Sequence, residues 1–143
     1  LVAHIAPDWS AEEQAKTTRE ITTLYEQYRW LWQHPRHAEA SICGNITVHG
    51  RALPIQGQMD LLVETPDEVV ILDYKTGRNV PATPGDVSAN YLLQLKAYHA
   101  LVAQLYPAKT IRCAILWTAM PRLMWLDEAV AAVDWPTIGS NAA

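Results

Sequence analysis

The chain has 143 residues, enough for one domain with its own core and too few for two ordinary domains. Half of the residues are hydrophobic and 18% are charged, which excludes the composition typical of disordered proteins. The net charge is -4, from 11 lysines and arginines against 15 aspartates and glutamates. Binding to DNA or to an anionic membrane would therefore need a local patch or metal ions, because the overall field is repulsive.

The first predicted element is a helix that begins after Ser10 and ends by His34. Ser10-Ala11-Glu12-Glu13 has the form of a capping box, in which the serine hydroxyl and the second glutamate each bond a backbone amide. Pro35 ends the helix because proline disfavours helical geometry in the residue before it. Apolar and aromatic residues recur between these ends at helical spacing: Ile21, Leu24, Tyr25, Tyr28, Leu31 and Trp32.

Three strands that can pair antiparallel are expected next. They cover His37 to Val48, Leu53 to Val63 and the residues from Val69 onward, with turns at His49-Gly50-Arg51 and Pro66-Asp67-Glu68. Pro54 and Gly57 loosen the second strand. The third begins with the continuous apolar run Val69-Val70-Ile71-Leu72, which predicts a central strand buried on both faces.

A loop from Gly77 to Asp86 separates these strands from a second predicted helix, Ser88 to Tyr106, which Pro107 ends. We expect one face of this helix to be buried: Leu93, Ala97, Ala100, Leu101 and Leu105. Two more strands, Ile111 to Thr118 and Leu123 to Leu126, precede a tail over residues 128–143. This order of elements predicts an α/β (α+β) fold, a sandwich around one mixed sheet flanked by helices.

The two cysteines, Cys43 and Cys113, lie far apart and have no Cys-x-x-Cys pattern or histidine at finger spacing. This argues against a zinc site and a four-thiolate iron–sulfur cluster, so we expect both to be buried as small hydrophobic residues. No apolar run approaches the roughly 18 residues of a membrane span, and no signal-peptide pattern is present, which predicts a soluble, cytoplasmic protein. Because the chain begins with Leu1 rather than Met, we expect it to be a fragment.

A carboxylate and an ammonium group follow the apolar start of the third strand. Side chains alternate along a strand, so Asp73 and Lys75 lie on one face about 7 Å apart along the chain. Asp60 lies near the end of the preceding strand, and hairpin pairing can bring it close to Asp73. The spacing leaves two interpretations open: a metal site, or a solvated Asp73–Lys75 ion pair beside an aspartate that closes a turn.

The first interpretation suits phosphodiester hydrolysis. A hard cation such as Mg²⁺ neutralises the phosphate and lowers the pKa of a bound water, and it needs only one or two carboxylates from the protein. Asp60 and Asp73 supply these carboxylates. Lys75, beside them, can orient the attacking water or stabilise charge in the transition state.

Three linked motifs carry a resemblance to a known family: Gly57-x-x-Asp60, Asp73-Tyr74-Lys75-Thr76-Gly77 and Gln94-x-x-x-Tyr98. Together they resemble the PD-(D/E)xK nuclease superfamily, in particular its RecB-like branch. From about Glu39 to about Leu126, the sequence is similar to the C-terminal nuclease domain of AddA-type helicase-nuclease subunits of bacteria. The resemblance implies a restriction-endonuclease-like core over residues 36–127, after a leading helix in residues 1–35.

The same resemblance implies roles for individual residues. Asp60 and Asp73 match the metal-binding acids, the backbone carbonyl of Tyr74 is a further ligand, and Lys75 matches the catalytic lysine. Gln94 and Tyr98 match the helix motif of the branch, and their i, i+4 spacing puts both on one helix face, near the site and a DNA backbone. A polar helix surface with a half-buried tyrosine is the competing interpretation of this pair.

The sequence departs from the branch at one point. The branch usually has a metal-binding histidine in a Gly-x-x-x-His stretch upstream, and His4 is the one candidate near the start but lacks that context. We expect the motif to lie in a missing N-terminal part, which leaves the activity of the fragment alone open. His34 and His37 are expected at the surface, and Glu39 is a candidate additional acid on the first strand.

By resemblance, the activity is that of an Mg²⁺-dependent deoxyribonuclease, an exonuclease in which Mn²⁺ substitutes for Mg²⁺. The parent protein would use ATP, pair with an AddB-like subunit and process double-strand DNA ends for recombinational repair; this chain itself has no ATP-binding phosphate loop. The alternative is a catalytically inactive nuclease-fold scaffold for DNA-end binding or subunit contact. The intact Asp60, Asp73 and Lys75 argue against it, and the number of cysteines excludes a Cas4-like exonuclease with an iron–sulfur cluster.

Overall fold

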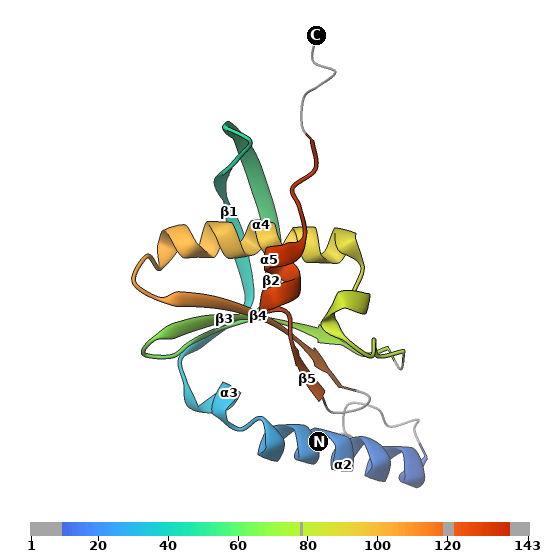
Figure 1. Cartoon of the computed structure of the whole chain (residues 1–143). Helices are drawn as coiled ribbons and strands as arrows, with labels where there is room; N and C mark the ends of the chain where they lie inside the picture. The colour runs from blue at the N-terminus through green and yellow to red at the C-terminus, as the bar shows by residue number, and fades with distance from the viewer. Residues whose placement is uncertain (1–9, 78, 119–121, 138–143) are drawn as a thin grey trace.

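The computed structural model describes residues 10–77, 79–118 and 122–137, which form one five-stranded mixed sheet with helices on both faces (Figure 1). The strands are β1 (Arg36–Val48), β2 (Arg51–Glu64), β3 (Glu68–Lys75), β4 (Thr110–Trp117) and β5 (Arg122–Trp125). The helices are α2 (Ala11–Gln27), α3 (Trp30–Gln33), α4 (Ala89–Leu105) and α5 (Asp127–Ala132), with a 3-10 turn η1 at Pro84–Asp86. None of the helices in the described ranges has the length and apolar content needed to span a bilayer.

The strands lie in the order β1-β2-β3-β4-β5, so neighbours in the sequence are neighbours in the sheet. The first three form an antiparallel meander, β3 and β4 are parallel and joined through α4, and β5 returns antiparallel. The apolar run of β3 is at most 1% exposed, because helices cover both faces of the sheet at this strand. The predicted mixed sheet, its three-strand meander and its buried central strand are confirmed.

Two hydrophobic cores lie on opposite faces of the sheet (Figure 1). Helices α4 and α5 cover one face and contribute Leu95, Val102 and Val130 to the larger core. Helix α3 covers the other face, where Leu31 is fully buried. Successive side chains of β3 point into the two cores alternately, so every second one faces α4.

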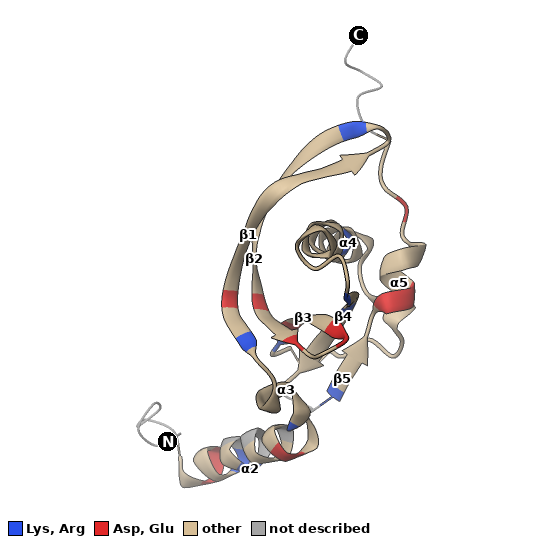
Figure 2. Ribbon diagram, turned by 90° about the vertical axis from the view of Figure 1, so that its left-hand side faces the viewer, with Lys and Arg blue, Asp and Glu red and all other residues tan. Residues whose placement is uncertain are grey.

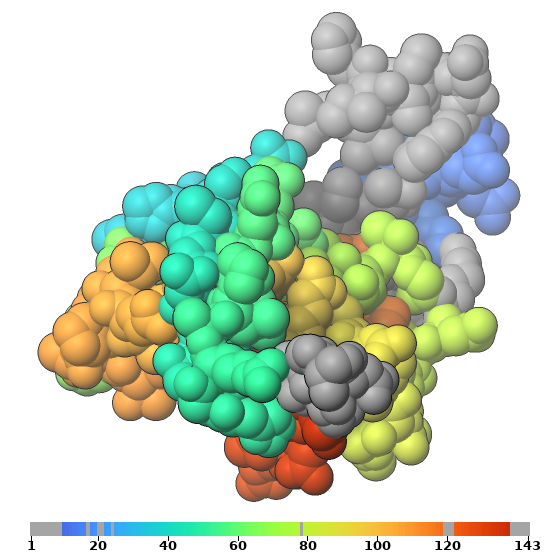
Figure 3. Space-filling model, turned by 90° about the horizontal axis from the view of Figure 1, so that it is seen from above, coloured from blue at the N-terminus to red at the C-terminus, as the bar shows by residue number. Residues whose placement is uncertain are grey.

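The β1–β2 hairpin leaves the sheet and curves over α4 (Figure 2). Strand β2 pairs with β3 only over Leu61–Glu64, while its pairing with β1 continues to Arg51. Seen from above, the hairpin crosses the middle of α4 (Figure 3). A Cβ atom built on Gly44 would lie 2.7 Å from Leu101 Cδ1, so the hairpin and the helix are in direct contact. Helix α4 is therefore enclosed between the sheet and the hairpin.

The N-terminal capping box is confirmed. The Glu13 amide donates to Ser10 Oγ over 3.1 Å, and the Ser10 amide donates to a Glu13 carboxylate oxygen over 2.9 Å. The single helix predicted from Ser10 to His34 is instead divided into α2 and α3. The break lets Leu31 enter the smaller core and lets the Tyr28 hydroxyl accept a hydrogen bond from the Leu123 amide, 2.7 Å away.

The buried face predicted for the second helix is partly wrong. Ala97 and Leu101 are buried as expected, but Leu105 is 66% exposed. The side chains that are buried are Leu92, Leu95, Ala97, Tyr98, Leu101 and Val102. The buried face of α4 is wider than the predicted face and rotated from it, because the hairpin covers the helix on the side away from the sheet. The predicted tail also begins with a helix, α5, whose first-turn Asp127 accepts a hydrogen bond from the Cys113 amide at 2.9 Å.

The expectation that both cysteines are buried holds for one of them. Cys113 is fully buried, and this burial raises the pKa of its thiol to about 12. Cys43 is exposed, because it alternates on β1 with the buried Ile42 and lies on the outer side of the hairpin.

Candidate active site

Asp60 lies where β2 departs from regular geometry. Before it, Met59 packs in the larger core; after it, Leu61 packs in the smaller core and Leu62 in the larger. The alternation of side chains therefore slips by one residue at this point, although β1 and β2 keep the same register on both sides of it. On the paired strand, Glu39 has a φ of 50°, and the ladder omits the Glu39–Asp60 pair.

The Asp60 side chain bonds to β3 just beyond the point where the backbone pairing of β2 with β3 ends. The β2–β3 ladder ends at the Leu61–Leu72 pair, and Asp60 Oδ2 accepts a hydrogen bond from the Tyr74 amide at 2.8 Å. The N–H and C=O of a strand residue point to the same side, so the Tyr74 carbonyl is also directed toward the side of Asp60. This places two kinds of oxygen donor together, a carboxylate and a backbone carbonyl.

Asp73 and Lys75 lie at the end of β3 and face α4, as the alternation predicts. Their side chains meet: Lys75 Nζ is 3.1 Å from Asp73 Oδ2, with the lysine side chain 41% and the aspartate 23% exposed. The ion pair foreseen in the alternative interpretation is therefore present. It does not stand alone, because Asp60 adds a second carboxyl to it.

The two carboxyl groups titrate as a pair. A side-chain hydrogen bond with Asp73, together with burial, raises the pKa of Asp60 above its ordinary value. Burial acts to raise the pKa of Asp73 as well, but hydrogen bonds from Asp60, Tyr91 and Lys75 bring it below its ordinary value. As the pH falls, Asp60 therefore takes up a proton before Asp73 does.

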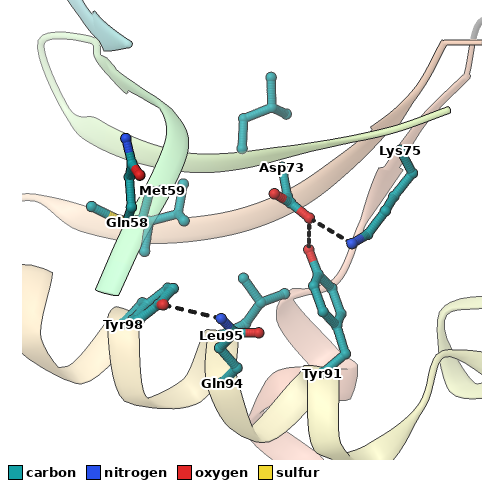
Figure 4. Close-up of a pocket in the computed structure, with 10 residues that line it drawn as sticks. Gln58, Met59, Asp73, Lys75, Tyr91, Gln94, Leu95 and Tyr98 are labelled. Carbon is teal, nitrogen blue, oxygen red and sulfur yellow. Dashed lines mark hydrogen bonds and ion pairs between the residues drawn. The ribbon is translucent and has the colours of Figure 1, made fainter. Parts of the chain in front are cut away.

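Tyr91, in the first turn of α4, is a functional candidate that our sequence analysis missed. Its hydroxyl donates to Asp73 Oδ2 at 2.7 Å, and its ring centroid lies 4.6 Å from Lys75 Nζ (Figure 4). Burial, followed by the hydrogen bond to Asp73, raises the pKa of this hydroxyl, which keeps it a donor. The sequence could have indicated Tyr91 by its position three residues before Gln94, on the same face of the helix.

Gln94 and Tyr98 share a helix face, as their spacing predicts. Gln94 Nε2 donates to the Tyr98 hydroxyl at 3.0 Å. Tyr98 is buried against β2, where a Cβ atom on Gly57 would lie 2.0 Å from its hydroxyl oxygen. A cavity of about 170 Å³ opens between this pair and β3 (Figure 4). Its polar lining consists of Gln58, Asp73, Lys75, Tyr91, Gln94 and Tyr98.

The other acids and histidines that the sequence singled out are not gathered at this cavity. The Glu39 side chain is exposed on β1, and His37 pairs with Glu64 at 3.1 Å on the surface. His34 is partly exposed at the end of α3, and His4 lies outside the described residues. Within the described ranges, no three residues of the His, Cys, Asp or Glu types are grouped so that they could hold a metal ion together.

The donors at the end of β3 nevertheless fit a hard divalent cation. Such an ion takes oxygen ligands, keeps several waters and needs one or two carboxylates. Asp60 and Asp73 lie within hydrogen-bond reach of each other, so a cation bound between them would offset the repulsion of their two charges.

Comparison with known proteins identifies the family of the chain. The profile of the PD-(D/E)XK nuclease superfamily matches residues 1–130. The sequence matches none of the curated proteins with which it was compared. Among solved structures, the crystal structure of SSO0001 is 12% identical with a TM-score of 0.43; the match covers 91% of this chain and 60% of that protein's chain. The expected fold class is confirmed, and the chain belongs to the PD-(D/E)XK nuclease superfamily.

Proposed function

We propose that this chain is a divalent-metal-dependent DNA nuclease domain whose site lies at the end of β3. The observation that carries the proposal is the meeting of two carboxyls, Asp60 and Asp73, within hydrogen-bond reach of each other, with the Lys75 ammonium 3.1 Å from one of them. A surface ion pair alone would not need the second carboxyl. Membership of a nuclease superfamily, whose members generally use divalent metal ions on DNA, supports the same chemistry.

In this proposal, Asp60, Asp73 and the Tyr74 carbonyl hold the cation. When bound, the cation would neutralise phosphate charge and lower the pKa of a bound water. Asp60 also bonds the Tyr74 amide, so this one side chain fixes the position of the backbone that carries the third oxygen. Mg²⁺ is the ion that we propose, with Mn²⁺ as a substitute.

Lys75 is the proposed catalytic residue. Its ammonium group is partly exposed and lines the cavity beside Asp73. A fixed positive charge at that place stabilises the negative charge that develops on the phosphate oxygens, and it can orient the attacking water.

Gln94 is proposed to contact the DNA strand, with the buried Tyr98 holding its side chain in place. Their side chains form one hydrogen-bonded unit on the α4 wall of the cavity, facing β3 across it. Amide and hydroxyl groups bind sugar and phosphate oxygens without reading the base sequence. We therefore expect these residues to affect the KM for DNA more than the affinity for metal.

The wider role that we propose rests on the linked sequence motifs. Their order and spacing support a RecB-like nuclease domain of an AddA-type helicase-nuclease, with an AddB-like partner, in the bacterial cytoplasm. In such an assembly the motor, which uses ATP, would deliver a DNA strand to this exonuclease site. The processing of double-strand ends for recombinational repair is part of this proposal.

The test is metal-dependent cleavage of end-labelled single- and double-stranded DNA by the full chain. We expect cleavage with Mg²⁺ or Mn²⁺, none with EDTA, and a loss of at least about 100-fold in Asp73→Asn and Lys75→Ala. Asp67→Asn and Lys16→Ala are matched controls, because both side chains are exposed and neither lines the cavity. Cleavage at the wild-type rate in either site variant would contradict the assignment.

A second measurement separates the nuclease from an inactive scaffold. We expect calorimetry to show Mn²⁺ binding that Asp73→Asn abolishes. If the wild-type chain neither cleaves DNA nor binds Mn²⁺, the inactive scaffold is favoured instead. In the parent protein, Asp73→Ala should remove DNA cleavage and leave ATP-dependent unwinding unchanged.

A further inference from the structure

We infer that Tyr91 is a positioning residue of this site: its hydroxyl orients the Asp73 carboxylate for metal binding, and its ring holds the Lys75 ammonium group in place. The inference rests on the proposed function, and it assigns two separate tasks to one side chain. Tyr91 lies outside the three sequence motifs and comes from α4, whereas Asp73 and Lys75 come from β3 (Figure 4).

The hydroxyl and the ammonium act on the same carboxylate oxygen. Tyr91 donates to Asp73 Oδ2 at 2.7 Å, and Lys75 Nζ lies 3.1 Å from that atom. Because both contacts fall on Oδ2, they fix the rotation of the carboxylate plane and leave Oδ1 for Asp60 or a metal ion. Hydrogen bonds of this kind to ligating carboxylates commonly determine metal affinity.

The backbone of Tyr91 is itself held in place. Its amide donates to the Oγ of Ser88, the N-cap of α4, at 3.3 Å. Its ring is partly buried and packs against the larger core. The hydroxyl is thus presented from a capped helix end rather than from a loop, so little conformational freedom is lost when it bonds Asp73.

The ring acts on Lys75. A lysine side chain that is 41% exposed would sample several rotamers, but the Tyr91 ring lies 4.6 Å from its Nζ, within the range of a cation–π contact. This contact does not depend on the hydroxyl. Removing the hydroxyl and removing the ring should therefore give different defects.

The first experiment removes only the hydroxyl, with Tyr91→Phe in the full chain. We expect the Kd for Mn²⁺, measured by calorimetry, to rise ten- to hundredfold. We also expect cleavage to return toward the wild-type kcat at saturating Mn²⁺, with the KM for DNA unchanged. Tyr28→Phe is the matched control, because its hydroxyl makes a hydrogen bond of the same 2.7 Å length on the opposite face of the sheet.

A wild-type Mn²⁺ Kd in Tyr91→Phe would overturn the role of the hydroxyl. So would an equal weakening in Tyr28→Phe, because the effect would then be one of general stability. Asp73→Asn separates a failure of the proposed metal site from a failure of the role of Tyr91. If Asp73→Asn binds Mn²⁺ as tightly as the wild type, the proposed metal site fails; if only Tyr91→Phe is unaffected, the metal site stands and the inference fails.

The second experiment compares Tyr91→Phe with Tyr91→Leu at saturating Mn²⁺. We expect the leucine variant to have a kcat lower by a further factor of about ten, because it also loses the ring contact to Lys75. Thermal unfolding verifies that each variant is folded, and Tyr91→Met replaces the leucine variant if the latter is not. An equal kcat in the phenylalanine variant and the ring-less variant would overturn the role of the ring.

Discussion

At the scale of single residues, the site brings two like charges together. The pKa of Asp60 is raised by its hydrogen bond with Asp73 and by burial, and the charge of Asp73 acts in the same direction. Lys75 offsets part of this repulsion for Asp73. Sites that favour function in this way commonly lower the stability of the fold.

We predict that Asp60→Asn stabilises the metal-free protein. The amide oxygen of the new side chain can still accept the hydrogen bond from Tyr74, while the like charge beside Asp73 is removed. Thermal unfolding in EDTA at pH 7 should give a Tm higher by about 2 °C or more. Mn²⁺ should raise the Tm of the wild type and not that of the variant, and Asp67→Asn should match the wild type in both conditions.

The Tm advantage of Asp60→Asn should depend on pH, and the direction follows from the pKa shift of Asp60. The pKa of Asp60 is higher in the folded state than its ordinary value of 3.8, so the folded protein holds this proton more tightly than the unfolded chain. The resulting contribution to stability is complete below pH 3.8 and is lost as the pH rises through the folded-state pKa. The Tm advantage of Asp60→Asn should therefore shrink as the pH falls toward 4, and an advantage that grows on acidification would contradict it.

At the scale of elements, the contact between the hairpin and α4 determines the shape of the cavity. Gly57 lets the Tyr98 ring lie directly on β2, with its hydroxyl beside Gln94. A Cβ atom at Gly57 would lie 2.6 Å from Tyr98 Cζ, in the body of a buried ring that has little room to move. At Gly44, the nearest atom is the end of a flexible leucine side chain.

We predict that Gly57→Ala destabilises the protein by about 1–3 kcal/mol, because it forces β2 away from α4. Gly85→Ala is the control, since its Cβ would have no neighbour closer than 3.8 Å and should change the free energy of unfolding by less than about 0.5 kcal/mol. Urea unfolding measures both variants. Equal effects would mean that the close approach of Tyr98 to β2 does not constrain the fold.

At the scale of the whole molecule, the acidic balance limits how this domain meets DNA. The net charge is -4, and several cations are already engaged within the chain. They are Arg36, Lys75, Lys96, Lys109, Arg112 and Arg122. The domain alone is therefore poorly suited to capture DNA, as expected if a larger assembly delivers the strand in the way that we propose.

We predict weak, weakly salt-dependent binding of single-stranded DNA by the isolated chain. Fluorescence anisotropy in EDTA should give a log K against log salt slope of magnitude below about 2, which corresponds to about three phosphate contacts at roughly 0.7 each. Mg²⁺ should increase the affinity in the wild type and not in Asp73→Asn. A slope steeper than about 4 without metal would reveal a basic DNA-binding surface and contradict this view.

The sequence by itself determined the order of the elements, the capping of the first helix and the mixed sheet. It also placed Asp73 beside Lys75 and Gln94 beside Tyr98, because these features depend on the periods of a strand and a helix. Residues that are close in sequence on one element need only that element to form in order to meet.

Only the tertiary structure decided how α4 is covered and what joins it to β3. The curved hairpin set the buried face of α4, the exposure of Cys43 and Leu105, and the irregularity of β2 at Asp60. It is packing between elements that brings Tyr91 to Asp73, eighteen positions apart. No local period encodes such contacts, because they arise when separate elements bury their apolar faces against one another.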